Sequence, residues 1–168
     1  AMKINSAVII NQITEKITTP KTILGERLVS YSFKEKGLSK SRNRALSIAI
    51  ADVCVIADDD MYYVDNYESI IEESYQKFPD ADVIAFYVDD ENVDLQKRKL
   101  KAGRVRLLRS MKISSVQLTF KRQSIVSNKI CFDEKFGAGA INYMGEENIL
   151  LFDCIEKGLK IYSVPIKI

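Results

Sequence analysis

The sequence predicts an α/β fold: a three-layer sandwich in which helices cover both faces of a mainly parallel sheet. Strand-like and helix-like segments alternate along the chain, which is the pattern of such folds. The segment VCVIA, residues 53–57, is apolar on both faces, as a central parallel strand should be. The segment 67–78 instead carries its apolar side chains at helical spacing. Together these observations favour a sheet packed between helices.

The first strands are predicted from short apolar patterns. Residues 7–10 (AVII) form an apolar run, and residues 27–33 (RLVSYSF) alternate between polar and apolar side chains. The polar stretch 11–25 between them predicts a loop.

A helix follows the second strand. A serine hydroxyl can cap a helix, so we expect it to begin at Ser39 or Ser41. Its buried side would be formed by Ala45, Leu46, Ile48 and Ala49. A right-handed crossover through this helix predicts that residues 7–10 pair between two neighbours, 27–33 and 53–57.

The second half of the chain continues the alternation. Asp65 or Asn66 begins a helix that Pro79 ends, and its apolar positions are Tyr67, Ile70, Ile71, Tyr75 and Phe78. Further strands are predicted at 82–88, 115–120 and 160–166, and a buried helix at 148–156, which Gly158 ends.

The composition limits the functions that the chain can have. Its 168 residues suffice for one domain, residues 1–168, with its own core. The chain has no histidine, which excludes histidine metal sites, histidine bases and Ser-His-Asp triads. Its three cysteines lie in apolar surroundings and are typical of reduced core residues. We therefore expect a cytoplasmic protein, or one at the inner face of the membrane.

One segment is strongly basic. Residues 95–112 carry eight lysines and arginines and no acid; because the whole chain has a net charge of only +2, the remainder is acidic, with a net charge of −6. Like charges repel, so this pattern predicts a mobile segment or a solvated helix face. The alternative is a surface that binds nucleic acid or an anionic membrane. The basic residues are Lys97, Arg98, Lys99, Lys101, Arg104, Arg106, Arg109 and Lys112.

Three aspartates, Asp58, Asp59 and Asp60, directly follow the strand 53–57. Two like charges about 4 Å apart cost about 1 kcal/mol even in water. In parallel sheets, ligands bind beyond the carboxyl ends of the strands, and a divalent cation there would relieve the repulsion. Mg²⁺ takes one or two carboxylates and completes its shell with phosphate and water. The run therefore predicts a metal–diphosphate site; the alternative is a solvated turn that caps the next helix.

Three segments in chain order resemble a known family. They are GLSKSRNRAL (37–46), IADDD (56–60) and FDEKFGAGAINYMGEENIL (132–150). They are similar to the Gly-x-Ser-x-x-Arg-Asn segment, the Asp-x-Asp motif and the glycine-rich acceptor loop with its Gly-Glu-Asp in family 2 glycosyltransferases of the GT-A fold. The resemblance implies a Rossmann-like sheet. It also implies metal-dependent transfer of a sugar from a nucleotide-diphosphate donor to an acceptor hydroxyl, in polysaccharide or glycan synthesis.

The resemblance implies a donor site on the first two segments. Asp58 and Asp60 would bind a divalent cation, Mn²⁺ or Mg²⁺, that bridges the diphosphate. The nucleotide-sugar, with UDP as the favoured nucleotide, would contact Asn11, Arg42, Asp58 and Asp59.

The third segment implies the acceptor side. Glu147 aligns with the catalytic acid of the family and would take the acceptor's proton, while Glu146 would hydrogen-bond the acceptor. One base opposite the leaving group implies inversion at the anomeric carbon. The alternative for both is the first turn of a helix, whose dipole would lower their pKa, whereas burial would raise it. The glycines of the acceptor loop are Gly137, Gly139 and Gly145.

The chain departs from the family pattern at its beginning. The family opens with two strand–helix steps before the Gly-x-Ser-x-x-Arg-Asn segment, whereas this sequence has room for one such step and its following strand. The match therefore implies an N-terminally shortened form that lacks the first strand–helix unit. Asn11 and Gln12 then stand where the family has carboxylates, and an Asn can still pair with the imide edge of uracil.

Two other functions are open from the sequence. One is a metal-dependent phosphohydrolase, although its aspartate nucleophile would follow the first strand, and residues 58–60 follow the third. The other is a non-catalytic module that binds nucleic acid or an anionic membrane through residues 97–112. For a transferase, we expect as partners a nucleotide-sugar donor, a glycan or lipid-linked acceptor and a membrane surface, and no nucleic acid.

Overall fold

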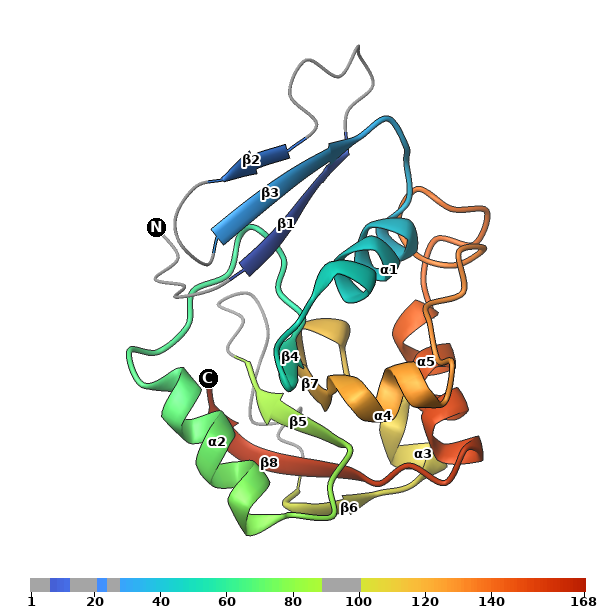
Figure 1. Ribbon diagram of the computed structural model, residues 1–168. Coiled ribbons are helices and arrows are strands. Elements are labelled where there is room, and N and C mark those ends of the chain that lie inside the picture. The colour runs from blue at the N-terminus through green and yellow to red at the C-terminus, as the bar shows by residue number, and fades with distance from the viewer. Residues whose placement is uncertain (1–6, 13–20, 24–27, 89–100) are drawn as a thin grey trace.

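A computed structural model describes residues 7–12, 21–23, 28–88 and 101–168, and in this part of the chain the strands form two sheets. The smaller sheet has the order β1-β3-β2 and the larger one the order β4-β7-β5-β8-β6 (Figure 1). Their bounds are β1 Ala7–Gln12, β2 Lys21–Ile23, β3 Leu28–Phe33, β4 Val53–Val55, β5 Val83–Tyr87, β6 Gly103–Val105, β7 Leu118–Lys121 and β8 Ile161–Lys167.

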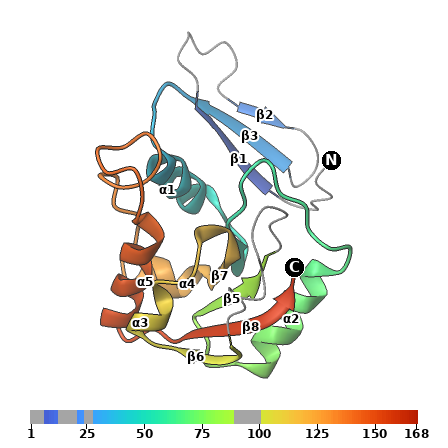
Figure 2. The same cartoon turned by 180° about the vertical axis from the view of Figure 1, so that it is seen from behind.

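Helices cover both faces of the larger sheet (Figures 1 and 2). Side chains alternate along β5, so Val83 and Ala85 pack on one face and Ile84 and Phe86 on the other. The first face contacts α4 and α5, and the second contacts α2. The helices are α1 Leu38–Ile48, α2 Tyr67–Lys77, α3 Leu107–Ser110, α4 Arg122–Ser127 and α5 Glu146–Glu156.

The predicted α/β class with helices on both sides of a sheet is confirmed. The pairing is more mixed than the sequence predicts. The pairs β1–β3 and β5–β8 are parallel, while β7 runs antiparallel between β4 and β5, and β6 and β2 are antiparallel edge strands. The prediction that residues 53–57 form a central parallel strand is therefore wrong, because β4 is an antiparallel edge strand of the described sheet. An apolar strand pattern specifies neither the direction of a strand nor the number of its neighbours.

The prediction that residues 7–10 pair between 27–33 and 53–57 is wrong. β1 pairs with β3 and lies at the edge of the smaller sheet, while β4 pairs with β7 at the edge of the larger one. The crossover rule governs the hand of a connection, but it does not require the strands on either side to close into one sheet.

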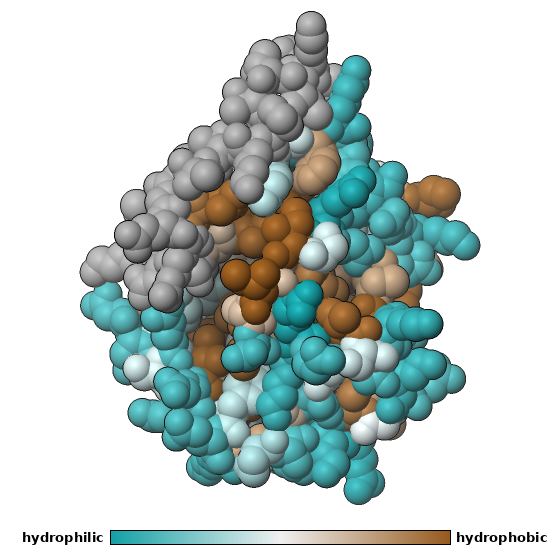
Figure 3. Space-filling view, in the orientation of Figure 1, coloured by the Kyte–Doolittle hydropathy of each residue, from teal (hydrophilic) through white to brown (hydrophobic). Residues whose placement is uncertain are grey.

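On the face seen in Figure 3, hydrophobic side chains gather below the smaller sheet.

The helix α1 is also packed differently from its prediction. Its N-cap is Gly37 rather than Ser39 or Ser41, and Ala45, Leu46, Ile48 and Ala49 are only half-buried. The side chains that α1 buries are those of Ser39 and Arg42. This helix therefore turns a polar side inward, toward the loop that precedes α5.

Smaller differences concern local segments. β2 lies within the predicted loop 11–25, and the predicted strand 115–120 is a 3₁₀ helix, Ser115–Gln117, followed by β7. The cysteines are free, but Cys131 is exposed rather than part of the core. In the basic segment, residues 101–112 form β6 and α3, while Lys97, Arg98 and Lys99 lie outside the described residues. Across the described residues, every helix is too short or too polar to span a membrane.

Candidate active site

The guanidinium of Arg42 joins residues from all three sequence segments. Arg42 lies on α1 and is only 8% exposed. Its Nη1 donates to Glu146 Oε1 at 2.9 Å, and its Nη2 donates to Ser115 Oγ at 2.8 Å and to Asp58 Oδ1 at 3.4 Å. The guanidinium carbon also lies 5.4 Å from the ring centroid of Phe132. The three segments that suggested a common site thus meet at one buried cation.

The charges of the Arg42 cluster are buried, so the positions of their partners affect the stability of the protein. Taking a charge out of water is costly, and the cost is offset only when an opposite charge and hydrogen bonds satisfy it. Glu146 is only 6% exposed and supplies the opposite charge, while Ser115 supplies an uncharged acceptor. The Nε of Arg42 is buried without a hydrogen-bond partner among the described residues. The pair is therefore tightly constrained rather than solvated.

The glycine-rich loop approaches this cluster closely at Gly137. Its φ is +100°, and a Cβ there would lie 3.1 Å from Ser39 Oγ and 3.2 Å from Glu146 Cδ. Both the backbone conformation and the lack of space require glycine. Ser39 Oγ donates to the carbonyl of Phe136 at 2.6 Å, and the amide of Leu38 donates to the carbonyl of Ala138 at 2.9 Å. The loop is thereby fastened to the first turn of α1.

Two amide side chains hold the backbone on either side of this contact. Asn43 Nδ2 donates to the carbonyl of Phe132 and Asn43 Oδ1 accepts from its amide, both at 2.9 Å. Gln12 bonds Gly37 in the same way, since its Nε2 donates to the carbonyl at 2.6 Å and its Oε1 accepts from the amide at 3.0 Å. Asn11, predicted to meet the nucleotide, donates through its Nδ2 to Ser30 Oγ within the smaller sheet.

Three residues of this framework were missed from the sequence. Ser39 and Ser115 were not assigned to the site, and Gln12 was considered only as a position that faces the base. The sequence gave a weak signal for Ser39, because this residue lies inside the first of the three segments that carry the family resemblance. Ser115 gave none, because nothing in the chain order places residue 115 beside Arg42.

The aspartate run forms a turn directly after β4. Asp58 is half-exposed and contacts Arg42, whereas Asp59 and Asp60 are exposed and have no ion-pair partner among the described residues. The described residues hold no group of three or more acidic, histidine or cysteine side chains arranged around one metal position. A cation that binds one or two carboxylates and otherwise takes phosphate and water does not need such a group. The oxygen-only donors at Asp58 and Asp60 therefore fit Mg²⁺ or Mn²⁺.

Tyr63 is a further residue of the part of the site that contains Asp58. Its hydroxyl is buried and has no hydrogen-bond partner among the described residues. Burial, together with Tyr67 and the charge of Asp58, raises the pKa of Tyr63 to about 12. The hydroxyl is protonated at neutral pH, as for any tyrosine, and is a donor without an acceptor among the described residues.

The two glutamates at the start of α5 have different surroundings. Gly145, at φ +103°, precedes the helix and lets the chain turn so that Glu146 points inward onto Arg42. Glu147 is half-buried, and burial, followed by the neighbouring charge of Glu146, raises its pKa. From the sequence, the helix dipole would lower the pKa of Glu147 and burial would raise it. The raised pKa indicates that burial is the larger effect. The protonated form of Glu147 is thus favoured relative to that of a solvated glutamate.

The structure therefore brings together part of the predicted site. Arg42, Asp58 and Glu146 are in contact, and Gly137 packs on Glu146. Gly139 packs instead on Lys36 and Gly37, where a Cβ would lie 3.2 Å from Lys36 Cγ. The roles of these residues, and of Asn11, Asp59, Asp60, Gly145 and Glu147, stay predictions.

Comparison with known proteins identifies the fold. No family model matches the chain, and no curated protein matches it. Among solved structures, residues 1–349 of TarS from S. aureus, a glycosyltransferase, match with a TM-score of 0.67 and 19% identity. The chain has a glycosyltransferase fold. The alignment covers 84% of this chain but 42% of that one, so the chain spans about two fifths of this neighbour.

The same neighbour has been solved with ligands. TarS 1–349 in complex with UDP matches with a TM-score of 0.64 and 19% identity, over 84% of this chain and 42% of that one. The complex with UDP-GlcNAc matches with a TM-score of 0.65 and 19% identity, over 83% and 40%. At this level of identity, the likeness establishes the fold alone.

Removing the guanidinium of Arg42 should destabilise the protein strongly. In Arg42→Gln, Glu146 would stay buried without its opposite charge, and breaking a buried pair in this way costs about 3–5 kcal/mol. On the same helix, Arg44 pairs with Glu35 at 3.4 Å but is exposed, so Arg44→Gln should cost less than about 1 kcal/mol. Urea unfolding measures both. Equal losses would show that Arg42 carries no special structural role.

The pKa of Glu147 should lie above its ordinary value of 4.5. Its carboxylate is then neutralised at a higher pH than that of a solvated glutamate as the pH falls. Since Glu146 contributes to the shift, Glu146→Gln should lower the pKa of Glu147. Titration of the side-chain carboxyl by carbon-13 NMR measures this directly, and the exposed Glu156 on the same helix serves as the internal reference. A Glu147 pKa unchanged by Glu146→Gln would contradict the coupling.

Proposed function

We propose that the chain belongs to a family 2 glycosyltransferase of the GT-A fold, which transfers a sugar from a UDP-sugar to the hydroxyl of a glycan or lipid-linked acceptor. The observation that carries the proposal is the Arg42 cluster, in which one buried cation holds the acid of the turn after β4 and the acid at the start of α5. The fold shared with TarS, which has been solved with UDP and UDP-GlcNAc, supports the class of donor.

We assign the turn after β4 to the diphosphate of the donor. Asp58 and Asp60 would hold Mg²⁺ or Mn²⁺, and a bound cation would neutralise the charge that develops on the diphosphate leaving group. Asp59 lies in the same exposed turn, where it can meet the nucleotide-sugar. The buried, protonated hydroxyl of Tyr63 supports this placement, because it lacks a partner among the described residues and lies where the charge of Asp58 acts on it.

The sequence suggested a nucleotide contact for Arg42, and its observed contacts favour another role. Its two terminal nitrogens already donate to Glu146, Ser115 and Asp58. We therefore assign it to orienting Asp58 rather than to binding the nucleotide. The same contacts make Glu146 a positioning residue, since its Oε1 accepts from Arg42 and its exposed fraction is small.

Glu147 is the residue that we assign to the acceptor's proton. A general base works best when its pKa lies toward the operating pH, and burial raises the pKa of Glu147 in that direction. The carboxylate would take the proton of the acceptor hydroxyl while the hydroxyl oxygen attacks the anomeric carbon. One displacement of this kind inverts the configuration of the sugar.

Asp60→Asn should abolish Mn²⁺-dependent binding of UDP-GlcNAc. The substitution removes one of two carboxylates that would coordinate the cation, without changing the volume of the side chain. Calorimetry with and without Mn²⁺ measures the effect, and Glu73→Gln, an exposed acid on α2, is the matched control. Binding that is the same for Asp60→Asn and the control would reject the metal role. Cleavage of p-nitrophenyl phosphate by the wild type would support a phosphohydrolase instead.

Glu147→Gln should lower turnover by roughly 10²–10⁴-fold, the usual contribution of a general base. Donor binding should be intact, because the substitution leaves the turn after β4 unchanged. Transfer from UDP-GlcNAc and calorimetry of the same variant separate the two effects, with Glu156→Gln on the same helix as the control. Normal turnover in Glu147→Gln together with an inactive Glu146→Gln would reverse the assignment.

A further inference from the structure

The basic segment forms a defined surface that the proposed active site does not use. Residues 101–112 contain five lysines and arginines and no acid. β6 pairs antiparallel with β8 at the edge of the larger sheet, and α3 follows it directly. The described part of the basic segment is thus an edge strand followed by a short helix, which gives its charges a defined arrangement.

Apolar side chains are exposed on the same surface. Leu107, Leu108 and Met111 are 49%, 79% and 58% exposed, whereas Ser110 and Ile113 are buried beneath them. The short helix therefore presents three large apolar groups to the solvent and anchors itself through the opposite side. Scattered exposed apolar residues are common, but three within five positions of one turn form a patch.

The side chain of Arg109 connects the elements that form this surface. Arg109 Nη1 donates to the carbonyl of Arg104 at 3.1 Å, and its Nη2 donates to the carbonyl of Lys101 at 2.6 Å and to Ser163 Oγ at 3.3 Å. Its charge is used to tie β6, α3 and β8 together. Lys101, Arg106 and Lys112 are exposed and have no ion-pair partner among the described residues.

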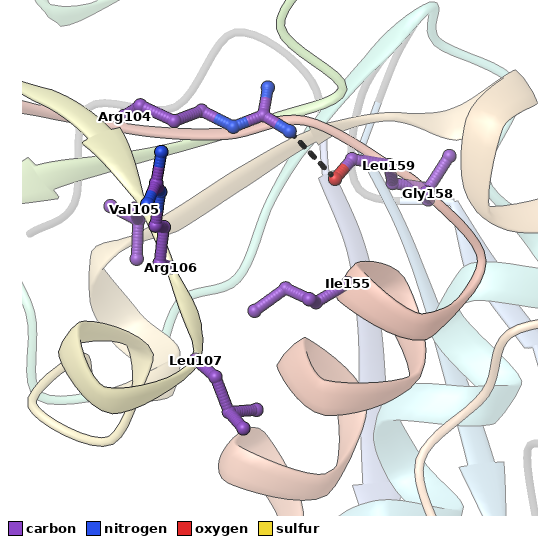
Figure 4. Close-up of a pocket in the computed structure, with 7 residues that line it drawn as sticks. All are labelled: Arg104, Val105, Arg106, Leu107, Ile155, Gly158 and Leu159. Atoms are coloured by element: carbon purple, nitrogen blue, oxygen red, sulfur yellow. Dashed lines mark hydrogen bonds between the residues drawn. The ribbon is translucent and has the colours of Figure 1, made fainter.

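A pocket of about 460 Å³ opens between this segment and the end of α5. Leu107 of α3 and Ile155 of α5 project toward the space between the two helices, and Arg104 extends across to the carbonyl of Leu159, to which it donates at 3.5 Å (Figure 4). Arg106 also lines the pocket. Two guanidinium groups above apolar walls suit a group with an anionic head and an apolar body.

We propose that the surface formed by residues 101–112 docks the protein onto an anionic lipid membrane. Leu107, Leu108 and Met111 enter the boundary between headgroups and acyl chains, and the surrounding cations pair with lipid phosphates. Arg104 and Arg106 receive one phosphate at the mouth of the pocket. The proposal rests on charge complementarity and exposed apolar area at this surface, and it does not depend on the proposed glycosyltransferase activity.

The side chains between the basic residues favour a membrane over nucleic acid. Single-stranded nucleic acid is held by aromatic side chains that stack on its bases, alternating with basic ones. Residues 101–112 contain no aromatic residue, and their exposed apolar groups are aliphatic or thioether. Such groups insert into lipid and have no role on a phosphate backbone.

Vesicle flotation with the whole chain tests the proposal. The protein should float with phosphatidylcholine vesicles that contain about 30% phosphatidylglycerol, and not with phosphatidylcholine alone. Leu108→Ser should weaken binding to the anionic vesicles roughly 10-fold, because the inserted side chain is lost. Arg106→Gln should weaken it roughly 5-fold, as expected for one charge near such a surface. The matched controls, Ile50→Ser at a side chain that is 93% exposed and Lys77→Gln on α2, should bind as the wild type does.

The remaining outcomes would each overturn the proposal. Equal flotation with neutral vesicles would remove the role of charge, and normal flotation of Leu108→Ser would remove the role of insertion. Binding of a single-stranded oligonucleotide that Leu108→Ser leaves intact, without flotation, would identify a nucleic-acid surface. Loss of flotation in inorganic phosphate, compared with chloride of equal ionic strength, would identify a site for free phosphate.

Discussion

The buried guanidinium of Arg42 is the constraint on which the rest of the site depends. A cation removed from water needs its acceptors in fixed positions, and those acceptors come from the turn after β4, the 3₁₀ helix before β7 and the start of α5. The start of α5 supplies the buried opposite charge through Glu146, while Ser115 and the half-exposed Asp58 share the other terminal nitrogen. The ion pair thus couples the turn assigned to the donor with the helix assigned to the acceptor.

The two neighbouring glutamates at the start of α5 have different surroundings, and the glycine-rich loop contributes to this difference. Gly137 lies against Glu146 because no larger residue fits there, and the close contact keeps water from the pair with Arg42. Glu147 is one position further along α5; the salt bridge of Arg42 on this helix is to Glu146, although the charge of Arg42 also lowers the pKa of Glu147. The pKa of Glu147 is raised by burial and, to a smaller extent, by the charge of Glu146. One glutamate is held in a buried salt bridge and the other has a raised pKa, a difference that agrees with the proposed division into a positioning residue and a base.

The sequence allowed prediction of those features that local patterns determine. The 3.6-residue period of α2 and the apolar run of β5 follow from burial on the sheet, and the structure has both elements, and the strand β4, close to the predicted places. What a strand pairs with is a property of two segments, so the edge position of β1 and the antiparallel β7 gave no local signal. The polar inner side of α1 was missed for the same reason. Apolar periodicity finds a helix face that meets a core, but Ser39 and Arg42 are buried against a loop and two acids.

The separation of the two sheets explains why one half of the site is more enclosed than the other. β1 and β4 are both edge strands, and both stay half-buried despite their β-branched, apolar sequences, whereas β5 has two neighbours and is almost fully buried. Asn11 and Gln12 end the first of these strands, and Asp58 follows the second, so the residues assigned to the donor lie beside strands that have one neighbour each among the described residues. Glu146 and Glu147 stand on α5, which packs on the larger sheet through Leu150 and Leu151. Glu147, the proposed base, is therefore placed by a complete core, while the aspartate turn is positioned by β4 and by the contact between Asp58 and Arg42.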